Sequence, residues 1–192
     1  MAKPRRNLRL FVGIYPSEPV ATRLSEVAAT IAPLVDGRCT REEQLHITAM
    51  FLGDTPTAGL DDVIESVNRS VSGLHSFTLQ IERLIALPEV RAARLVAAET
   101  NLPGPLGELH DRLVTRLAHG GRSGRPFRPH LTLVRLRRPA AVDESALQGL
   151  LPEEPLTWHV ETIHLMRSTL SHAGAQHHEV DAIRLGRSDH RR

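Results

Sequence analysis

Two histidine and threonine pairs are the residues in this chain best suited to chemistry. One pair is His46 and Thr48, the other is His130 and Thr132, and each has an apolar residue between its members and another directly after. Side chains on a β-strand alternate between its two faces, so the histidine and threonine of each pair point the same way. If the two strands lie side by side, we expect two imidazoles and two hydroxyls to converge on one cleft.

Such a cleft suits the hydrolysis of a cyclic phosphodiester. In-line displacement needs a base that takes a proton from water and, on the opposite side, an acid that protonates the departing ribose oxygen. Histidine, with an unperturbed pKa of about 6.5, can serve as either at neutral pH. The hydroxyls of Thr48 and Thr132 can bind the non-bridging oxygens, and a guanidinium such as that of Arg135 can neutralise their charge. This chemistry requires no metal and no cofactor.

A single His-x-Thr triplet carries little information. The chain has 11 histidines in 192 residues, so about one such triplet is expected by chance. Two copies, each inside an apolar strand pattern, have a chance expectation of about one in a hundred. The doubled motif therefore favours a catalytic interpretation over ordinary core histidines.

The apolar pattern predicts the elements that must position these motifs. We expect strands at 9–15, 45–52, 77–87, 92–99, 129–135, 156–166 and 177–185. We expect helices from Ser17, as N-cap, to about Pro33, and at 58–71, 105–118 and 143–150. The strand at 45–52 is expected to end at Gly53, and the strands at 77–87 and 92–99 to form a hairpin.

The order of these elements predicts the fold class. Helices and strands alternate irregularly and include a hairpin, which favours the α+β class with antiparallel sheets over a doubly wound parallel sheet. The length of 192 residues, 41% of them hydrophobic, fits one domain over residues 1–192. The polar segment 186–192 is expected to be a frayed tail.

The residues around both motifs resemble the paired signatures of the 2H phosphoesterase superfamily. The first signature is LHIT at 45–48 with FLG at 51–53, and the second is FRPHLTLVR at 127–135. Within the superfamily the chain looks most like the RNA 2',3'-cyclic phosphodiesterase family, also called the 2'-5' RNA ligase family. Residues 10–14, 165–170 and 174–175 match as well, so the resemblance spans nearly the whole chain.

This resemblance implies both a fold and a set of roles. The fold is bilobal, with two pseudo-symmetric lobes of antiparallel sheet and outer helices around a central cleft. By position, His46 is the proton donor to the leaving 3' oxygen and His130 is the proton acceptor that activates water. Thr48, Thr132 and Arg135 bind the substrate phosphate. The substrate is RNA with 2',3'-cyclic phosphate ends, the product is a 2'-phosphomonoester, and some members join tRNA halves in the reverse direction.

One segment departs from the family pattern, and other functions remain open. QHHE at 176–179 stands where many members carry an aromatic residue next to a glutamate, so the stacking of the nucleobase is not settled. A phosphodiesterase for 2'-5' oligonucleotides or for a small cyclic phosphate is one alternative. A non-catalytic RNA-end binding protein is another, although the presence of both histidines and both threonines counts against it.

The charge distribution favours an anionic partner. The net charge is only +2, but the pI of about 9.3 and an arginine-rich composition lean the surface towards anionic partners. The family resemblance implies that this partner is RNA, with tRNA fragments among the candidates. Six arginines lie around the second motif: Arg122, Arg125, Arg128, Arg135, Arg137 and Arg138. For Arg122, Arg137 and Arg138 a solvated face is an equal alternative to RNA contact.

The remaining residues indicate the setting of the protein. Aromatic residues make up 3% of the chain, and four of them are expected in the core: Tyr15, Phe51, Phe127 and Trp158. Five histidines have no acidic or cysteine partner at metal-ligand spacing, so we expect no metal: His159, His164, His172, His177 and His178. The lone Cys39 excludes an intrachain disulfide, and no apolar run is long enough for a membrane span. We expect a cytoplasmic monomer.

Overall fold

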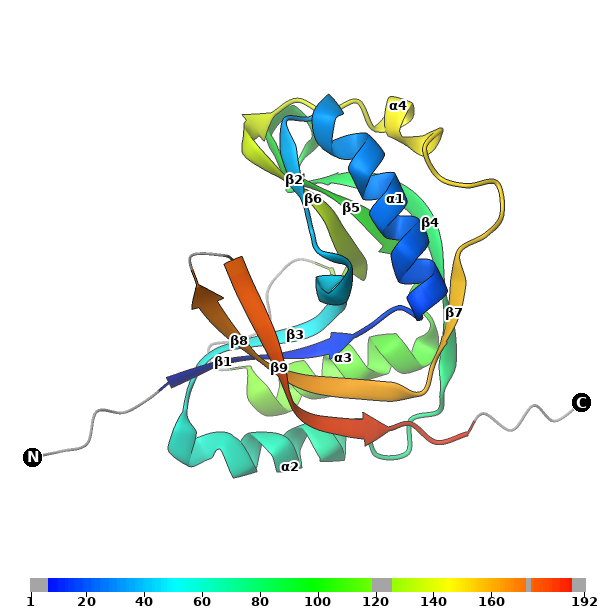
Figure 1. Cartoon of the computed structure of the whole chain (residues 1–192). Helices are drawn as coiled ribbons and strands as arrows, with labels where there is room; N and C mark the ends of the chain where they lie inside the picture. Colours follow the sequence, from blue (N-terminus) through cyan, green and yellow to red (C-terminus); the bar gives the residue numbers. More distant parts are fainter. Residues whose placement is uncertain (1–6, 119–125, 172–173, 188–192) are drawn as a thin grey trace, which may run out of the picture.

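The computed structural model describes residues 7–118, 126–171 and 174–187 (Figure 1). Its strands are β1 (Asn7–Ile14), β2 (Gly37–Cys39), β3 (Ile47–Pro56), β4 (Phe77–Leu87), β5 (Ala93–Thr100), β6 (His130–Ala140), β7 (Thr157–Val160), β8 (Thr162–Ser171) and β9 (Gly174–Arg184). Its α-helices are α1 (Glu18–Leu34), α2 (Leu60–Val71), α3 (Gly104–Leu117) and α4 (Glu144–Gln148). None of the described helices combines the length and apolar character that crossing a membrane requires.

The strands form one curled antiparallel sheet with two lobes. The order is β7-β4-β5-β6-β3-β1-β8-β9, and β2 also pairs with β6. β1, β3, β8 and β9 make up one lobe, and β2, β4, β5, β6 and β7 make up the other (Figure 1). The lobes meet where Ile47 of β3 pairs with Leu131 of β6. These are the residues directly after His46 and His130, so the predicted side-by-side arrangement of the two motifs and the bilobal α+β fold are confirmed.

The helices cover the outer faces of the lobes, and two of them, α1 and α3, do so by crossing over. α1 follows β1 in the chain but packs on β2 and β6 of the other lobe, whereas α3 follows β5 and packs on β3 (Figure 1). The buried side of α3 consists of leucines spaced three and four residues apart: Leu106, Leu109, Leu113 and Leu117. Each such leucine stabilises the fold by roughly 1.5–3 kcal/mol. Each lobe is thus held by a helix that enters from the opposite lobe.

The prediction of one strand at 156–166 is wrong, because this segment forms two strands that belong to different lobes. β7 ends at Val160 and pairs with β4, while β8 begins at Thr162 and pairs with β1 and β9. The buried positions shift from even numbers, Trp158 and Val160, to odd numbers, Ile163 and Leu165. This shift in alternation marks the point at which the chain passes from one lobe to the other.

Other helix and strand boundaries in the structure also differ from the predicted ones. β3 does not end at Gly53 but continues to Pro56, because Gly53 adopts a φ of 72° at a register shift and the pairing with β1 resumes beyond it. Ser17 occupies the N-cap of α1 without a side-chain cap bond, and the helix passes Pro33 to end at Leu34. The last strand begins at Gly174, three residues before the expected start.

The expected tail at 186–192 is held by hydrogen bonds at its beginning. The backbone of Gly186 bonds to Leu74 and Ser76, and His75 Nδ1 lies 3.0 Å from the carbonyl oxygen of Arg187. Fraying therefore does not begin at Gly186. Residues 188–192 lie outside the described part of the chain.

Candidate functional site

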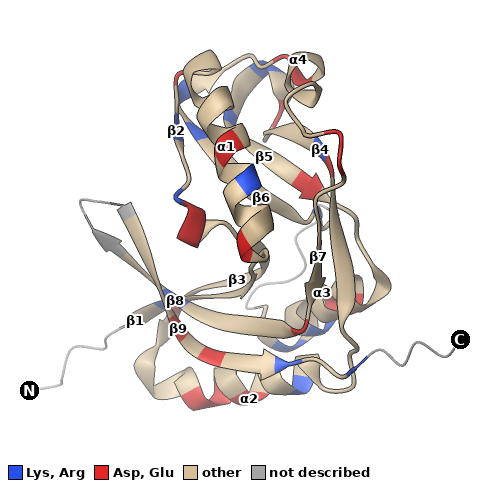
Figure 2. Ribbon diagram, turned by 45° about the vertical axis from the view of Figure 1, so that its right-hand side comes forward, with Lys and Arg blue, Asp and Glu red and all other residues tan. Residues whose placement is uncertain are grey.

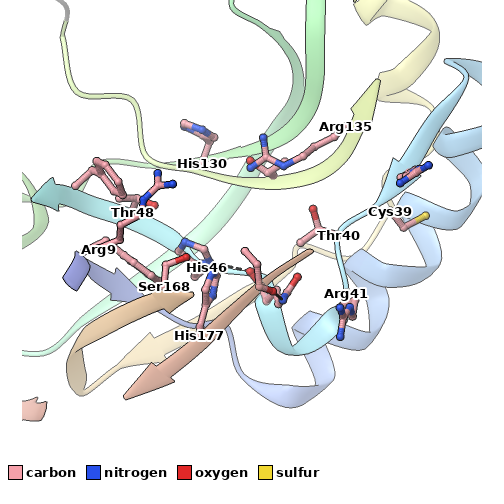
Figure 3. Close-up of a pocket in the computed structure, with 16 residues that line it drawn as sticks. Arg9, Cys39, Thr40, Arg41, His46, Thr48, His130, Arg135, Ser168 and His177 are labelled. Atoms are coloured by element: carbon pink, nitrogen blue, oxygen red, sulfur yellow. Dashed lines mark hydrogen bonds between the residues drawn. The ribbon is translucent and has the colours of Figure 1, made fainter. Parts of the chain in front are cut away.

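A cleft between the lobes brings together all five predicted site residues (Figure 3). They are His46, Thr48, His130, Thr132 and Arg135. The cleft has a volume of about 480 Å³, within the range of small-ligand sites. Figure 3 shows the side chains of His130 and Arg135 entering from β6 on one side, opposite those of His46 and His177.

The two imidazoles are anchored in the same way. His46 Nδ1 lies 2.7 Å from the carbonyl oxygen of Gln44, and His130 Nδ1 lies 2.8 Å from that of Arg128, in each case two residues earlier in the chain. A carbonyl oxygen can only accept, so Nδ1 carries the hydrogen in both rings. Nε2 is then the nitrogen that each neutral ring offers as a base, or as a donor once protonated.

A β-bulge follows each threonine and decides what faces the cleft next. Against β1, Thr48 is opposite Gly13, but the next partner pair joins Met50 to Val12. Against β5, the register likewise skips one residue after Thr132. An extra residue reverses the alternation beyond it. The side chains five positions after the histidines, Phe51 and Arg135, therefore line the cleft instead of entering a core.

Phe51 corrects one sequence prediction. It was expected in the core, but it is 52% exposed, and the guanidinium carbon of Arg9 lies 5.4 Å from its ring centroid. The bulge at Ala49 is the physical reason, because strict alternation would have turned the ring away from Thr48. Trp158, by contrast, is buried as predicted.

Phe127 and His110 connect the two motifs through α3. The two rings stack with centroids 4.1 Å apart and an interplanar angle of 5°. His110 Nδ1 also lies 2.8 Å from the carbonyl oxygen of Ala49, the bulge residue of the first motif. Phe127 precedes His130 by three residues, so one helix side chain contacts both segments.

His177 is a site residue that the motif analysis missed. It lies opposite Ser168 where β9 pairs with β8, and it lines the cleft. Its ring meets that of His46 edge-on, with centroids 5.0 Å apart and an angle of 85°, and its centroid lies 4.9 Å from that of Phe11. Burial lowers its pKa, and the charge of His178 adds to this effect. The sequence signal was the departure at 176–179, which placed two histidines where an aromatic residue was expected.

The environment of His46 favours its neutral form. Burial lowers its pKa from 6.5 to about 4, against the effect of the hydrogen bond to Gln44. The positive charges of His177, Arg135 and His130 lower it further. His46 is therefore uncharged at pH 7.

Arg128 does not act as a free cation beside the cleft. Its Nε lies 2.7 Å from one oxygen of Glu99, and Nε of Arg83 lies 2.6 Å from the other. Burial alone would raise the pKa of Glu99, but the hydrogen bonds from both arginines outweigh it and hold that pKa below its usual value. Because Glu99 is opposite His130 in the sheet, this ion-paired group braces the segment that carries the second motif.

The other predicted arginines have different positions. Arg137 pairs with Asp36 at 3.2 Å, which supports the solvated-face alternative for that residue. Arg122 and Arg125 lie outside the described residues. Three further arginines line the cleft beside Arg135: Arg9, Arg38 and Arg41. Arg38 belongs to β2, where Figure 2 shows a basic position, and Arg41 follows this strand in the chain.

The histidines considered for a metal have other surroundings. His164 Nδ1 lies 2.7 Å from a carboxylate oxygen of Glu179, and His159 Nδ1 lies 3.4 Å from the hydroxyl of Thr78. Within the described ranges, no three His, Cys, Asp or Glu side chains gather as a metal site would need. His172 lies outside those ranges.

Comparison with known proteins identifies similar chains. A family model described as the 2'-5' RNA ligase superfamily matches residues 16–171. A Thermus thermophilus protein named RNA 2',3'-cyclic phosphodiesterase is 27% identical over 201 residues, covering 96% of this chain and 93% of the relative. A protein of the same name from Methanothermobacter thermautotrophicus is 26% identical, covering 93% and 99%.

Solved structures agree with this comparison in fold. The crystal structure of TT0787 from Thermus thermophilus superposes with a TM-score of 0.75 at 25% identity, covering 95% of this chain and all of that one. Escherichia coli LigT complexed with 3'-AMP superposes with a TM-score of 0.75 at 22% identity, covering 94% and 99%.

Proposed function

Because this chain belongs to the 2'-5' RNA ligase superfamily, we propose that it hydrolyses the 2',3'-cyclic phosphate ends of RNA to 2'-phosphomonoesters. One observation carries the proposal: two imidazoles, both anchored through Nδ1, enter one cleft together with two threonines and an arginine. Two relatives that align with nearly the whole chain are named for this activity.

The proposed mechanism assigns one proton transfer to each histidine. Nε2 of His130 takes a proton from the attacking water, and the new bond forms between the water oxygen and phosphorus. The bond from phosphorus to the 3' oxygen breaks, and Nε2 of His46 delivers a proton to that oxygen. Thr48, Thr132 and Arg135 bind the non-bridging oxygens as their negative charge grows. Nothing in these steps requires a metal ion.

The low pKa of His46 adds a condition to this mechanism. A ring that is neutral at pH 7 cannot donate a proton, so His46 must gain one when substrate binds. The cyclic phosphodiester brings a negative charge into the cleft, and a nearby opposite charge favours the protonated form. Substrate binding thus prepares His46 as an acid, while the same ring stays neutral in the free enzyme.

The decisive experiment uses an RNA oligonucleotide ending in a 2',3'-cyclic phosphate, incubated in EDTA. A 2'-phosphate product supports the proposal. Turnover of 2'-5' linkages alone, or of small cyclic phosphates alone, would indicate a related phosphodiesterase with that substrate. Binding without turnover would indicate an RNA-end binding protein. Retention of activity in EDTA separates the histidine mechanism from one that depends on a metal.

Ligation would use the same groups with a different nucleophile. A 5'-hydroxyl would take the place of water and attack the 2',3'-cyclic phosphate, and departure of the 3' oxygen would leave a 2'-5' bond, which is the reverse of 2'-5' cleavage. Adding an RNA with a 5'-hydroxyl to the same assay tests this reaction. The joined product is detected by its length and by its resistance to an enzyme that cuts only 3'-5' linkages.

A further inference from the structure

We propose that the nucleotides preceding the cyclic end of an RNA strand bind in a second hollow beside the catalytic cleft. The inference rests on the proposed function and extends it from the reacting phosphate to the strand that carries it. The hollow has a volume of about 860 Å³ and lies between the β4–β5 connection and β6. Three arginines line it, Arg94, Arg128 and Arg135, together with apolar residues that include Leu87 and Leu95.

The hollow adjoins the catalytic cleft at Arg135. This residue lines both cavities. In the pairing of β5 with β6, His130 is opposite Glu99, Thr132 is opposite Ala97 and Arg135 is opposite Leu95. Partners in a sheet share a face, and the bulge after Thr132 keeps all these side chains on the cleft side. One sheet face therefore leads from the reacting phosphate into the second hollow.

The length of this path suits a ligand longer than one nucleotide. Leu95 pairs with the residue five positions after His130, which at about 3.3 Å per residue places it on the order of 15 Å along the strand. A nucleoside 2',3'-cyclic phosphate held between His46 and His130 leaves this hollow empty. An oligonucleotide ending in the same group extends into it.

The charges suit an RNA backbone. Arg94 is exposed and forms no ion pair with any residue in the described ranges, and Arg128 is held in place by Glu99. Glu89 is the one carboxylate in the described lining, and of the three guanidinium groups only that of Arg128 is already paired, with Glu99. Arginine forms bidentate hydrogen bonds with phosphate oxygens, and each phosphate neutralised makes binding more sensitive to salt.

The rest of the lining suits a nucleobase without reading its identity. Leu87, Leu95 and the rings of Pro88 and Pro126 offer apolar surface. No aromatic side chain in the described residues lines the hollow, so we expect packing against a base with little sequence preference. The combination of apolar floor and basic rim, joined to a phosphate site, identifies single-stranded RNA as the occupant.

The experiment compares two substrates with the same reactive end, a nucleoside 2',3'-cyclic phosphate and a trinucleotide ending in that nucleotide. We expect Arg94→Ala to lower kcat/KM for the trinucleotide by about three- to tenfold, to reduce its salt dependence by about one phosphate contact, and to leave the mononucleotide unchanged. Arg91→Ala is the matched control, because Arg91 is an exposed arginine of the adjoining β4–β5 connection and does not line the hollow. It should affect neither substrate.

Two results would overturn the inference while leaving the proposed function intact. One is a wild-type enzyme with equal kcat/KM for both substrates, and the other is an Arg94→Ala variant that loses the same factor on both. If neither substrate is hydrolysed, the proposed function fails instead. Binding of a trinucleotide with a 2'-phosphate end then decides the inference, which is refuted if Arg94→Ala and wild type bind it equally.

Discussion

The two halves of the site share a backbone design but differ in the chemistry they present. In each half the histidine bonds through Nδ1 to the carbonyl two residues back, a threonine follows two residues on, and a bulge turns the fifth residue into the cleft. That fifth residue is Phe51 in one half and Arg135 in the other. The repeated backbone places matching imidazoles, and the fifth position makes the two sides unequal.

The surroundings of the two histidines differ as well. The ring of His46 contacts those of Phe11, Tyr15 and His177, because β1, β8 and β9 extend the sheet beyond it. No ring in the described residues packs on His130 in this way, and its anchor Arg128 is tied to Glu99. Equal groups in unequal environments take different protonation roles. The comparison therefore predicts that equivalent substitutions in the two halves have different consequences.

The largest effect should come from removing either imidazole. We expect His46→Ala and His130→Ala each to lower kcat on cyclic-phosphate RNA by on the order of 100- to 10,000-fold, because each takes away one proton transfer. Single-turnover rates measure this loss, and thermal unfolding of each variant controls for folding. A variant with an unchanged rate would show that its histidine has no catalytic part.

Substitution at the fifth positions should distinguish the two halves. Arg135→Ala is expected to lower kcat by roughly 10- to 100-fold, since its charge acts on the phosphate in the transition state. Phe51→Ala should mainly raise KM, by about three- to tenfold, because an exposed ring can pack on a base but holds no charge. Steady-state kinetics on one RNA substrate measure both. Equal kcat losses in the two variants would contradict the asymmetry.

The pKa of His46 predicts a loss of stability in acid. Its folded pKa of about 4 lies below the unfolded value of 6.5, so between these values the unfolded chain binds more protons. The contribution of His46 to the free energy of unfolding is complete above pH 6.5. It falls by about 3 kcal/mol as the pH decreases from 6.5 to 4. Urea unfolding from pH 7 to 4 measures this loss, which should shrink in His46→Gln. An equal pH dependence in both proteins would show that His46 titrates normally.

Phosphate binding offers a second test of the same group. An anion in the cleft should raise the pKa of His46 well above 4, which NMR titration of its ring protons in the presence and absence of inorganic phosphate can follow. If the pKa stays near 4 with phosphate bound, His46 cannot be the proton donor, and the roles of the two histidines would have to be exchanged.

Alternation explains what the sequence could predict and where it failed. The rule that side chains alternate placed His46 with Thr48 and His130 with Thr132 correctly, because no irregularity falls inside either triplet. It failed for Phe51, since the bulge at Ala49 depends on pairing with β1 and leaves no local signal. Arg135 was proposed for its charge and its place in the family signature, and only the bulge brings it to the cleft.

Tertiary contacts between distant segments could not be predicted from the sequence for a related reason. His177 reaches His46 because β9 lies two strands away from β1, an order that local periodicity does not specify. The division of 156–166 at Glu161 was visible as a shift of buried positions, but a shift of this kind also fits a bulge. Only the partner strands, β4 for one piece and β1 for the other, distinguish the two.

The smallest expected effect concerns the contact that couples the two halves. His110→Phe keeps a ring against Phe127 but removes the donor to the Ala49 carbonyl. We expect a loss of about 1 kcal/mol in unfolding free energy, as for one hydrogen bond, and a fall of about threefold in kcat with KM unchanged, because the bulge that positions Thr48 and Phe51 loosens.

His110→Gln is the matched variant, since its amide can donate to Ala49 without a ring to stack. If the Ala49 carbonyl is the more important partner, the kcat of His110→Gln is closer to that of wild type than the kcat of His110→Phe is. If the stack on Phe127 is more important, the order reverses and the second motif is the one that His110 supports. Equal kcat in wild type and both variants would show that the two halves hold their geometry independently, each through its own bulge.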